Sequence, residues 1–465
     1  MDKKSQLSFS KTSKIIKEND LSTTEKIIRF LVENQNKYSF FDLSKIAENA
    51  NQLRLENSAY YTDESLLNLI EEHLPVFEKD TISVLEPSVG VGNFLPIIFS
   101  KYPDKRIKLD VVDLDGESLK ILETLLSLYG LPENLEINYF NENFCDFVPK
   151  KEYDLAIGNP PFSKIKREYF FKKSKKYYKN LDSTNLASYF YEKCLSCSQY
   201  VCMVLPKNIL NTPEYAKTRE YLEQKNVQTI LDFGENGFRG VLVETVFIKT
   251  SNSGCSEYVD VHSMTKGLRI EQRPGYIFDK RFPYWIIYRN ELFDRFADSL
   301  EFGVFSCFRD RQLTNKNTHH SKEGLRVLKS RNISDDGRRI IDFDGYDEYV
   351  DINEAINKTV YSFLNRDDVY LTPNMTYNVR VMQKPTGLLV NGSVAILIPK
   401  KRLQLSSDDL AFFSSPEYRK FMQIARNYQT RTLNIDSTSV FFFGIKKADH
   451  SNRFSRKTLE DTILS

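Results

Sequence analysis

Between residues 81 and 250, short apolar runs alternate with longer amphipathic stretches. The short runs predict buried strands, and the stretches with apolar residues three and four apart predict helices. The predicted strands lie at 81–86, 107–115, 135–140, 154–158, 200–206, 227–234 and 243–250, and the predicted helices lie at 93–102, 116–130, 188–198 and 214–225. Strands that alternate with helices build a mainly parallel sheet covered on both faces. The sequence therefore predicts a doubly wound α/β domain.

The pattern changes on either side of this region. Residues 1–50 are expected to form a polar lead-in followed by helices, and Ser22-Thr23-Thr24-Glu25 has the chemistry of a capping box. A further helix is expected to begin near Thr62. After about residue 252, short strands, turns and aromatic residues predict a mixed α+β domain. We expect three parts: a helical lead-in over 1–50, an α/β domain over 51–251 and a C-terminal domain over 252–465.

A glycine-bearing turn, LEPSVGVGNFL at residues 85–95, joins the first predicted strand to the first helix. Gly90 and Gly92 would let the backbone approach a ligand closely. Glu86 ends the strand, where a carboxylate would repel a pyrophosphate but suit a cation such as the amino group of S-adenosyl-L-methionine. Asp113 ends the next strand, where an acid binds ribose hydroxyls. These residues predict a site for S-adenosyl-L-methionine.

The stretch YDLAIGNPPF at residues 153–162 raises a second chemical question. Two prolines cannot continue a sheet, so the chain must leave the strand in a rigid, extended form. The side-chain oxygen of Asn159 and the carbonyl of Pro160 are adjacent acceptors, which match the two hydrogens of an exocyclic amine. Phe162 offers a flat face for stacking a base. The segment therefore predicts a site that aims an amine at an activated methyl group.

Composition and charge add little to this picture. The chain has 41% hydrophobic and 28% charged residues and a formal net charge of +2, as expected for a globular protein. Lysines and aromatics interleave between Lys164 and Lys179, which is typical of a nucleic-acid surface, although charge runs are more often plain solvated surface. Cys194 and Cys197 lie in a predicted helix with no partner pair at zinc spacing, so we expect no metal. With no signal peptide or membrane span visible, a cytoplasmic protein is expected.

These motifs together resemble the gamma class of N6-adenine DNA methyltransferases of type II restriction–modification systems. Residues 59–250 carry the resemblance in the order of that class: Ala59-Tyr60-Tyr61-Thr62, LEPSVGVGNFL, Asp113, NPPF and the stretch that begins at Phe233. The resemblance implies a Rossmann-like methyltransferase fold and methyl transfer to the N6 amine of an adenine flipped out of duplex DNA.

The resemblance also implies roles for residues that the physical reasoning did not reach. Tyr61 and Thr62 would contact the cofactor, and Phe238 would pack on the flipped base. The class has an acid and an aromatic residue that contact the cofactor adenine about 16 residues before the catalytic Asn. That spacing indicates Asn143 and Phe144, but the nearest acid is Asp146, so the two alternatives stay open.

The segments at residues 326–334 and 371–400 resemble target-recognition domains, less specifically. An acid-free window there contains Asn374, Asn378, Arg380 and Gln383, which could meet phosphates and base edges. Double-stranded DNA is therefore the expected partner. One recognition domain per catalytic domain favours a monomer, and a cognate restriction endonuclease would be a separate, functional partner.

Two other classes of function were weighed. A protein glutamine N5-methyltransferase of the release-factor type shares the Asn-Pro-Pro chemistry, but such enzymes lack a large C-terminal basic domain. A non-catalytic DNA-binding specificity protein would not need Glu86, Asp113 and Asn159 together. Methylation of cytosine N4 or of RNA adenine also fits the residues.

Overall fold

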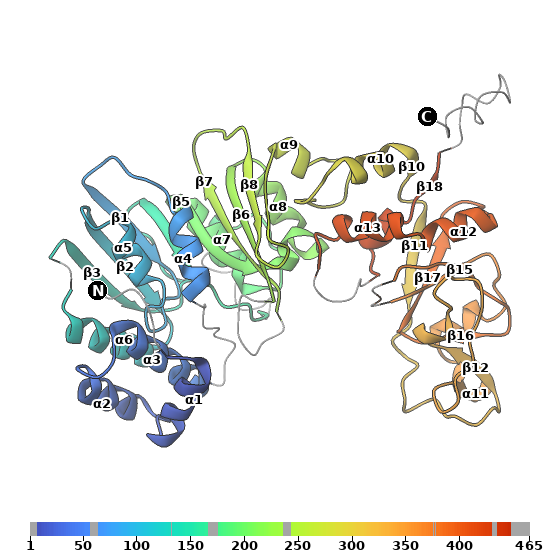
Figure 1. Cartoon of the computed structure of the whole chain (residues 1–465), viewed down its shortest axis with the longest axis horizontal. Helices are drawn as coiled ribbons and strands as arrows, with labels where there is room; N and C mark the ends of the chain where they lie inside the picture. The colour runs from blue at the N-terminus through green and yellow to red at the C-terminus, as the bar shows by residue number, and fades with distance from the viewer. Residues whose placement is uncertain are drawn as a thin grey trace. The chain divides into compact units, whose positions relative to one another are not determined.

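The computed structural model describes residues 7–55, 64–131, 133–165, 175–235, 243–374, 376, 378–429 and 435–447. The chain forms two compact units, Met1–Trp285 and Ile286–Ser465, with the elements drawn in Figure 1. Each unit is described by itself.

The first unit is built on a nine-stranded sheet with the order β3-β2-β1-β4-β5-β7-β6-β8-β9. Its strands are β1 (Thr81–Glu86), β2 (Arg106–Asp113), β3 (Leu135–Asn141), β4 (Tyr153–Gly158), β5 (Ser198–Pro206), β6 (Asn226–Gly234), β7 (Thr245–Ser251), β8 (Val259–Ser263) and β9 (Leu268–Gln272). Strands β1 to β5 are mutually parallel, whereas β7 is antiparallel to both β5 and β6. The predicted mainly parallel sheet is confirmed.

Side chains on alternate strand positions fill two separate layers. Ile82, Val84, Leu155 and Ile157 belong to a core shared with helices α1 to α6, while the intervening Ala156 is also fully buried. The helices are α1 (Phe9–Glu18), α2 (Thr24–Asn34), α3 (Phe40–Leu55), α4 (Glu64–His73), α5 (Leu95–Lys101), α6 (Gly116–Tyr129), α7 (Leu186–Cys197), α8 (Ala216–Leu222) and α9 (Pro274–Ile277). Helix α7 packs on the opposite face from that core, where the hydroxyls of Tyr191 and Thr250 share a 2.6 Å hydrogen bond. The sheet is doubly wound, as predicted.

The N-terminal helices are part of this unit and not a separate lead-in. Helix α1 packs on α3, and both α2 and α3 pack on α6. The Thr23 side chain caps α2 by accepting from the Lys26 amide, as the capping chemistry predicted. Helix α1 was not predicted: only Thr12 and Ile16 of its ten residues are buried, so its apolar signal is weak. The expected boundary at residue 50 is therefore absent.

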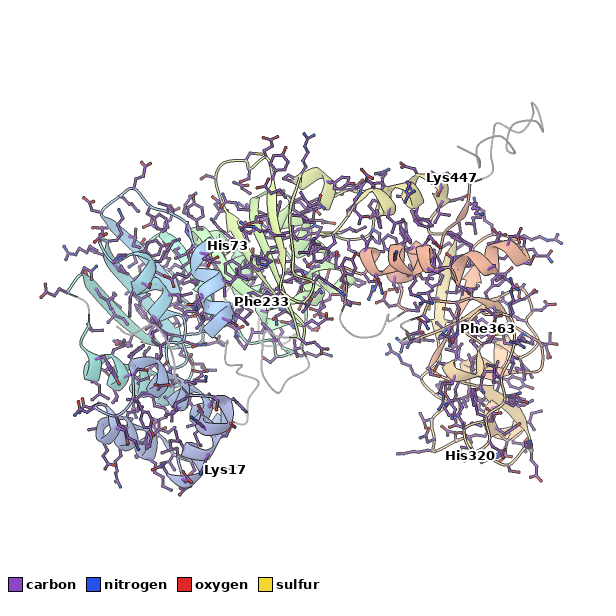
Figure 2. All side chains as sticks on the ribbon, viewed as in Figure 1. Lys17, His73, Phe233, His320, Phe363 and Lys447 are labelled. Atoms are coloured by element: carbon purple, nitrogen blue, oxygen red, sulfur yellow. The ribbon has the colours of Figure 1, made fainter. Side chains whose placement is uncertain are left out.

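The expected boundary at residue 251 is also wrong, because the sheet continues past β7. Strand β8 pairs parallel with β6, and β9 pairs antiparallel with β8. His73, labelled at the end of α4 in Figure 2, has its Nε2 atom 3.2 Å from the Asp260 carboxylate in β8. Polar residues alternate with buried ones in both strands, as at an exposed sheet edge, which made the segment resemble a new domain.

The second unit has a mixed α+β fold, as predicted, around its own apolar core. A four-stranded antiparallel sheet has the order β11-β17-β14-β15, a three-stranded sheet the order β13-β12-β16, and β10 pairs with β18. The strands are β10 (Leu300–Glu301), β11 (Phe305–Arg309), β12 (Leu325–Leu328), β13 (Glu348–Val350), β14 (Tyr370–Pro373), β15 (Met382–Gln383), β16 (Leu389–Val390), β17 (Val394–Pro399) and β18 (Ile445–Lys446). The helices are α10 (Glu291–Ser299), α11 (Ile352–Ala355), α12 (Ser407–Phe413) and α13 (Pro416–Ala425).

Among the described residues of both units, no helix combines the length and apolar character needed to cross a membrane.

The revised boundary predicts how shortened chains behave. A chain ending at Trp285 should keep the whole sheet and unfold cooperatively. A chain ending at Ser251 would lose β8 and β9, expose the edge of β6 and leave α4 without its His73–Asp260 contact. We expect the shorter chain to unfold at lower temperature and to aggregate, as measured by circular dichroism and light scattering. Equal stability of the two chains would contradict the revised boundary.

Candidate functional site

The candidate site lies where the strand order reverses. Strand β1 has β2 on one side and β4 on the other, so the connections leaving β1 and β4 diverge at their carboxyl ends. Such a switch point opens a crevice, which is where open α/β sheets bind ligands. Glu86 is the last residue of β1, and Asn159 directly follows the last residue of β4. The topology therefore places the predicted cofactor acid and the predicted amine-binding residue at the same edge.

The turn after β1 is shaped by two glycines in the left-handed region. Gly90 has φ of 55° and Gly92 has φ of 90°. A Cβ at Gly92 would lie 2.5 Å from Leu122 Cδ1, so the turn packs too closely on α6 for a side chain. The Gly90 amide donates to Asp113 Oδ2 at 2.7 Å, and the Asp115 amide donates to Asp113 Oδ1 at 2.9 Å. The structure thus brings the predicted ribose acid onto the glycine turn.

Glu86 is buried, with only 2% of its surface exposed. Burial raises the pKa of its carboxyl well above the ordinary value, and the nearby charges of Asp113 and Glu48 raise it further. Burial also raises the pKa of Asp113, although backbone donors at Asp115 and Gly90 partly offset this. A Cβ at Gly158 would lie 2.2 Å from Glu86 Oε1. The carboxylate therefore occupies the space that a side chain at the end of β4 would need.

This donor set fits S-adenosylmethionine better than a phosphate-bearing cofactor. Carboxylates suit a cation and ribose hydroxyls, and within the described ranges no lysine or arginine forms an ion pair with Glu86 or Asp113. The same described residues contain no group of three or more His, Cys, Asp or Glu side chains placed to hold a metal ion. Glu86, Gly90, Gly92 and Asp113 are thus gathered as the sequence predicted.

The Asn-Pro-Pro-Phe segment is held by neighbours at both ends. The Ser88 hydroxyl in the glycine turn donates to the Asn159 carbonyl at 3.2 Å, and the Asn185 amide donates to the Phe162 carbonyl at 3.2 Å. Pro160 is buried, whereas Asn159 and Phe162 are half-buried. The segment is thereby tied to the glycine turn on one side and to the start of α7 on the other.

The turn at residues 143–147 is fixed by its own backbone and by a buried lysine. Asn143 Oδ1 accepts from the Cys145 amide at 3.0 Å, while Asp146 is exposed. The Phe144 ring is 2% exposed and lies 4.9 Å from the Phe190 ring, so little of it is open to a ligand. The Lys193 amine donates to the Phe144 carbonyl at 2.5 Å. The choice between Asn143 and Asp146, and the stacking role of Phe144, stay predictions.

A buried ion cluster near this edge was missed by the sequence reasoning. Lys207, just after β5, has its amine 2.8 Å from Asp232 in β6 and 3.5 Å from Glu244, which precedes β7. Lys207 and Asp232 are 2% and 0% exposed. Charges this deeply buried must be paired, and pairing ties the ends of three strands together. A lone Lys in Pro-Lys-Asn-Ile carries no sequence signal for such a role.

Several predicted residues lie outside the described residues. They are Tyr61 and Thr62 of the upstream motif, Phe238, and residues 166–174 of the lysine-rich run. Their cofactor, base-stacking and DNA roles stay predictions.

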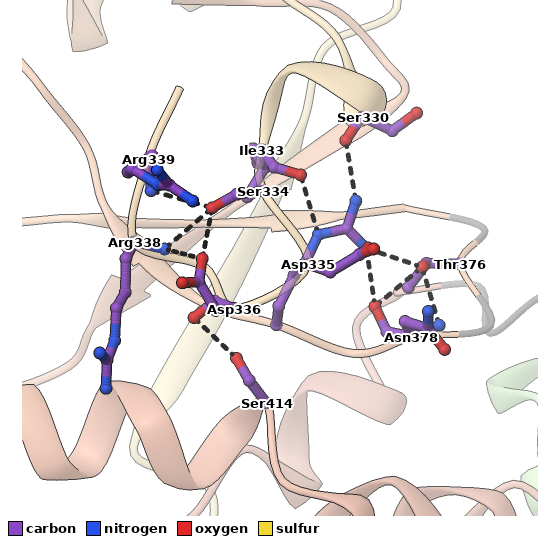
Figure 3. A network of polar contacts seen from close by, with 11 residues as sticks. Ser330, Ile333, Ser334, Asp335, Asp336, Arg338, Arg339, Thr376, Asn378 and Ser414 are labelled. Carbon is purple, nitrogen blue, oxygen red and sulfur yellow. Dashed lines mark hydrogen bonds and ion pairs between the residues drawn. The ribbon is translucent and has the colours of Figure 1, made fainter. Parts of the chain in front are cut away.

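The prediction that Arg380 and Asn374 meet DNA is corrected by the second unit. The Arg380 guanidinium is buried and donates to the carbonyls of Ser330, Ile333 and Asn378 at 3.1, 3.1 and 2.9 Å. Figure 3 shows these partners around one network. Asn374 is 3% exposed and donates to the Gly392 carbonyl. Both side chains hold the fold together, so neither is placed to read a base.

The sequence as a whole was then compared with known families. The profile described as Eco57I restriction-modification methylase matches residues 2–238, which is just over half of the chain. The chain belongs to the Eco57I restriction-modification methylase family. Its methyl donor is S-adenosylmethionine, for which Glu86, the glycine turn and Asp113 form a suitable site.

The solved structures agree with this fold. The type IIG restriction endonuclease BpuSI aligns with a TM-score of 0.50 and 13% identity, over 88% of this chain and 61% of its own. The type IIL restriction–modification enzyme MmeI, solved with DNA, aligns with a TM-score of 0.45 and 12% identity, over 93% of this chain and 67% of its own.

One curated relative covers a smaller region. Malonyl-[acyl-carrier protein] O-methyltransferase 2 of Ilyobacter polytropus is 30% identical over 107 residues, which span 22% of this chain and 39% of the relative. The chain thus spans well under two thirds of that relative and 61% of BpuSI.

The burial of Glu86 predicts opposite effects of one substitution on stability and binding. Because the folded-state pKa is raised, the native state holds this proton more tightly than the unfolded chain does. The stability contribution is therefore fully present at acidic pH and is lost as pH rises through the raised pKa. Glu86→Gln should raise the free energy of unfolding of the ligand-free protein at pH 7 by on the order of 1–3 kcal/mol, and it should weaken S-adenosylmethionine binding.

Denaturant unfolding at pH 5 and pH 8, together with calorimetry, checks this prediction. The gain in stability should be larger at pH 8. Glu123→Gln, an exposed substitution on α6, is the control and should change neither quantity. A Glu86→Gln protein that is less stable at pH 8 than the wild type would contradict the account.

The packing of Gly158 on Glu86 predicts that the smallest side chain is not tolerated there. Gly158→Ala places a methyl group 2.2 Å from Glu86 Oε1, so either the carboxylate or the end of β4 must move. We expect calorimetry to show a large loss of cofactor affinity. Gly275→Ala, with nothing within 4 Å of the added carbon, should bind as the wild type does. Unchanged affinity in Gly158→Ala would contradict the described crevice.

Proposed function

We propose that this methyltransferase methylates the N6 amine of adenine in double-stranded DNA and thereby protects DNA from a cognate restriction endonuclease. The observation that carries the proposal is the placement of Asn159-Pro160-Pro161-Phe162 at the carboxyl end of β4, next to the buried Glu86. Family membership supports a role in restriction–modification.

The acceptors at the end of β4 suit an exocyclic amine. The Asn159 side-chain oxygen and the Pro160 carbonyl would each accept one amine hydrogen. Two such bonds draw the nitrogen lone pair out of conjugation with the base and aim it at the methyl donor. Bound S-adenosylmethionine supplies the activated methyl group, so no strong base is required from the chain. Pro160 has no N–H, and its rigid backbone keeps the acceptors fixed.

A stacked adenine cannot reach this crevice, so the base must leave the duplex. Phe162 and Phe238 would stack on the flipped base. Lysines between Lys164 and Lys179 would meet the flanking phosphates without reading sequence. The second unit would supply sequence recognition, and the exposed cations Lys400, Lys401 and Arg402 replace the buried Arg380 as candidates for DNA contact.

The identity of the methylated group separates this proposal from its alternatives. Purified protein, duplex DNA of mixed sequence and S-adenosylmethionine carrying a labelled methyl group are incubated, and nucleosides are then analysed by mass spectrometry. The proposal expects N6-methyladenine in one sequence context. N4-methylcytosine alone, or labelling of a glutamine peptide with no labelling of DNA, would overturn it.

The proposed role of Asn159 predicts a loss of turnover without a loss of cofactor binding. The amide acts on the amine in the transition state, so Asn159→Ala should lower kcat by on the order of 100-fold or more, as for other transition-state hydrogen bonds. Calorimetry should show S-adenosylmethionine affinity close to that of the wild type. Asn19→Ala, exposed at the end of α1, is the control. More than about a tenth of wild-type turnover, a barrier change of only about 1.4 kcal/mol, would refute the assignment.

A further inference from the structure

Helix α3 brings a third carboxylate to the glycine turn. Glu48 is 9% exposed, and its Oε2 and Oε1 atoms lie 3.7 and 4.0 Å from where a Cβ of Gly90 would be. The Gly90 amide donates to Asp113. The turn is therefore bordered by Glu48 from the N-terminal helices as well as by Asp113 from β2.

The three carboxylates act on one another through space. The charges of Asp113 and Glu48 both disfavour ionisation of Glu86. In the described part of the chain, the one hydrogen bond to the Glu86 carboxylate is the long contact of 3.4 Å from the Ser88 amide. Like charges held this close are costly to bury unless a cation accompanies them. Since the described side chains do not form a metal-binding group, an organic cation is the better match.

We propose that Glu48 is a further cofactor-binding residue, which shares with Glu86 the positively charged methionine end of S-adenosylmethionine. This inference rests on the cofactor site described above and does not depend on the DNA substrate. Under it, α3 is a wall of the cofactor site. The missing Cβ of Gly90 keeps the space between the Glu48 carboxylate and the turn open.

A purely supporting role for Glu48 would have a different signature. If the side chain only held α3 against the turn, its substitution would weaken every adenosine ligand alike. If it meets the positive charges, the loss should follow the charge of the ligand. S-adenosylmethionine carries an ammonium and a sulfonium, S-adenosylhomocysteine keeps the ammonium alone, and methylthioadenosine has neither.

Calorimetry on the full-length protein without DNA tests the inference with these three ligands. Glu48→Gln keeps the shape of the side chain and removes its charge. We expect S-adenosylmethionine to bind roughly 10- to 100-fold more weakly, the range for a lost charge-assisted contact. S-adenosylhomocysteine should lose less, and methylthioadenosine should change by less than about twofold, within the scatter of a neutral surface substitution.

Two variants serve as controls. Asp113→Asn should weaken all three ligands, because each carries the ribose. Glu33→Gln, exposed on α2, should weaken none. If Glu48→Gln does not fold, Glu48→Asp retracts the charge while keeping it, and the ratio of S-adenosylmethionine to methylthioadenosine affinity should fall.

The outcomes decide between the roles. Wild-type affinity for S-adenosylmethionine in Glu48→Gln, an equal loss for all three ligands, or an unchanged affinity ratio in Glu48→Asp would overturn the inference. Failure of the wild-type protein to bind S-adenosylmethionine would also overturn it. Failure to methylate DNA adenine would overturn the proposed function alone.

Discussion

The buried carboxylate of Glu86 is the constraint on which the first unit depends. It ends β1 at the point where the sheet order reverses, with almost no exposed surface. Its presence requires a residue without a side chain at Gly158, and this fixes how β4 ends. Asn159 begins immediately beyond that glycine, tied to the turn through Ser88. One ionisable group thus sets the position of both the cofactor site and the amine-binding segment.

A buried acid of this kind destabilises the ligand-free fold, and the rest of the unit offsets that cost. Nine paired strands and apolar layers on both faces supply the stability. The Lys207–Asp232–Glu244 cluster fastens the same edge of the sheet at β5, β6 and β7. An enzyme that binds a cationic cofactor benefits from this imbalance, because the ligand supplies the missing charge.

The sequence predicted those features that depend on local pattern. The continuous apolar runs of buried parallel strands, such as β1 and β4, stand out from their neighbours, so these strands and the acids at their ends were placed correctly. Edge strands β8 and β9 alternate with polar residues and looked like a new domain. The burial of Arg380 depends on carbonyls of residues 330 and 333, nearly 50 positions away in sequence, which no local window contains. Glu48 was missed for the same reason, because its partner turn lies far along the chain.

The central claim is that the end of β4 holds the amine of a flipped adenine beside the cofactor. A crystal structure of the protein with a cognate DNA duplex and a non-reactive analogue of S-adenosylmethionine tests it most directly. The account predicts an extrahelical adenine whose N6 atom lies about 2.7–3.2 Å from both the Asn159 side-chain oxygen and the Pro160 carbonyl. An adenine that stays stacked in the duplex, or an extrahelical base whose amine does not contact Asn159, would contradict it.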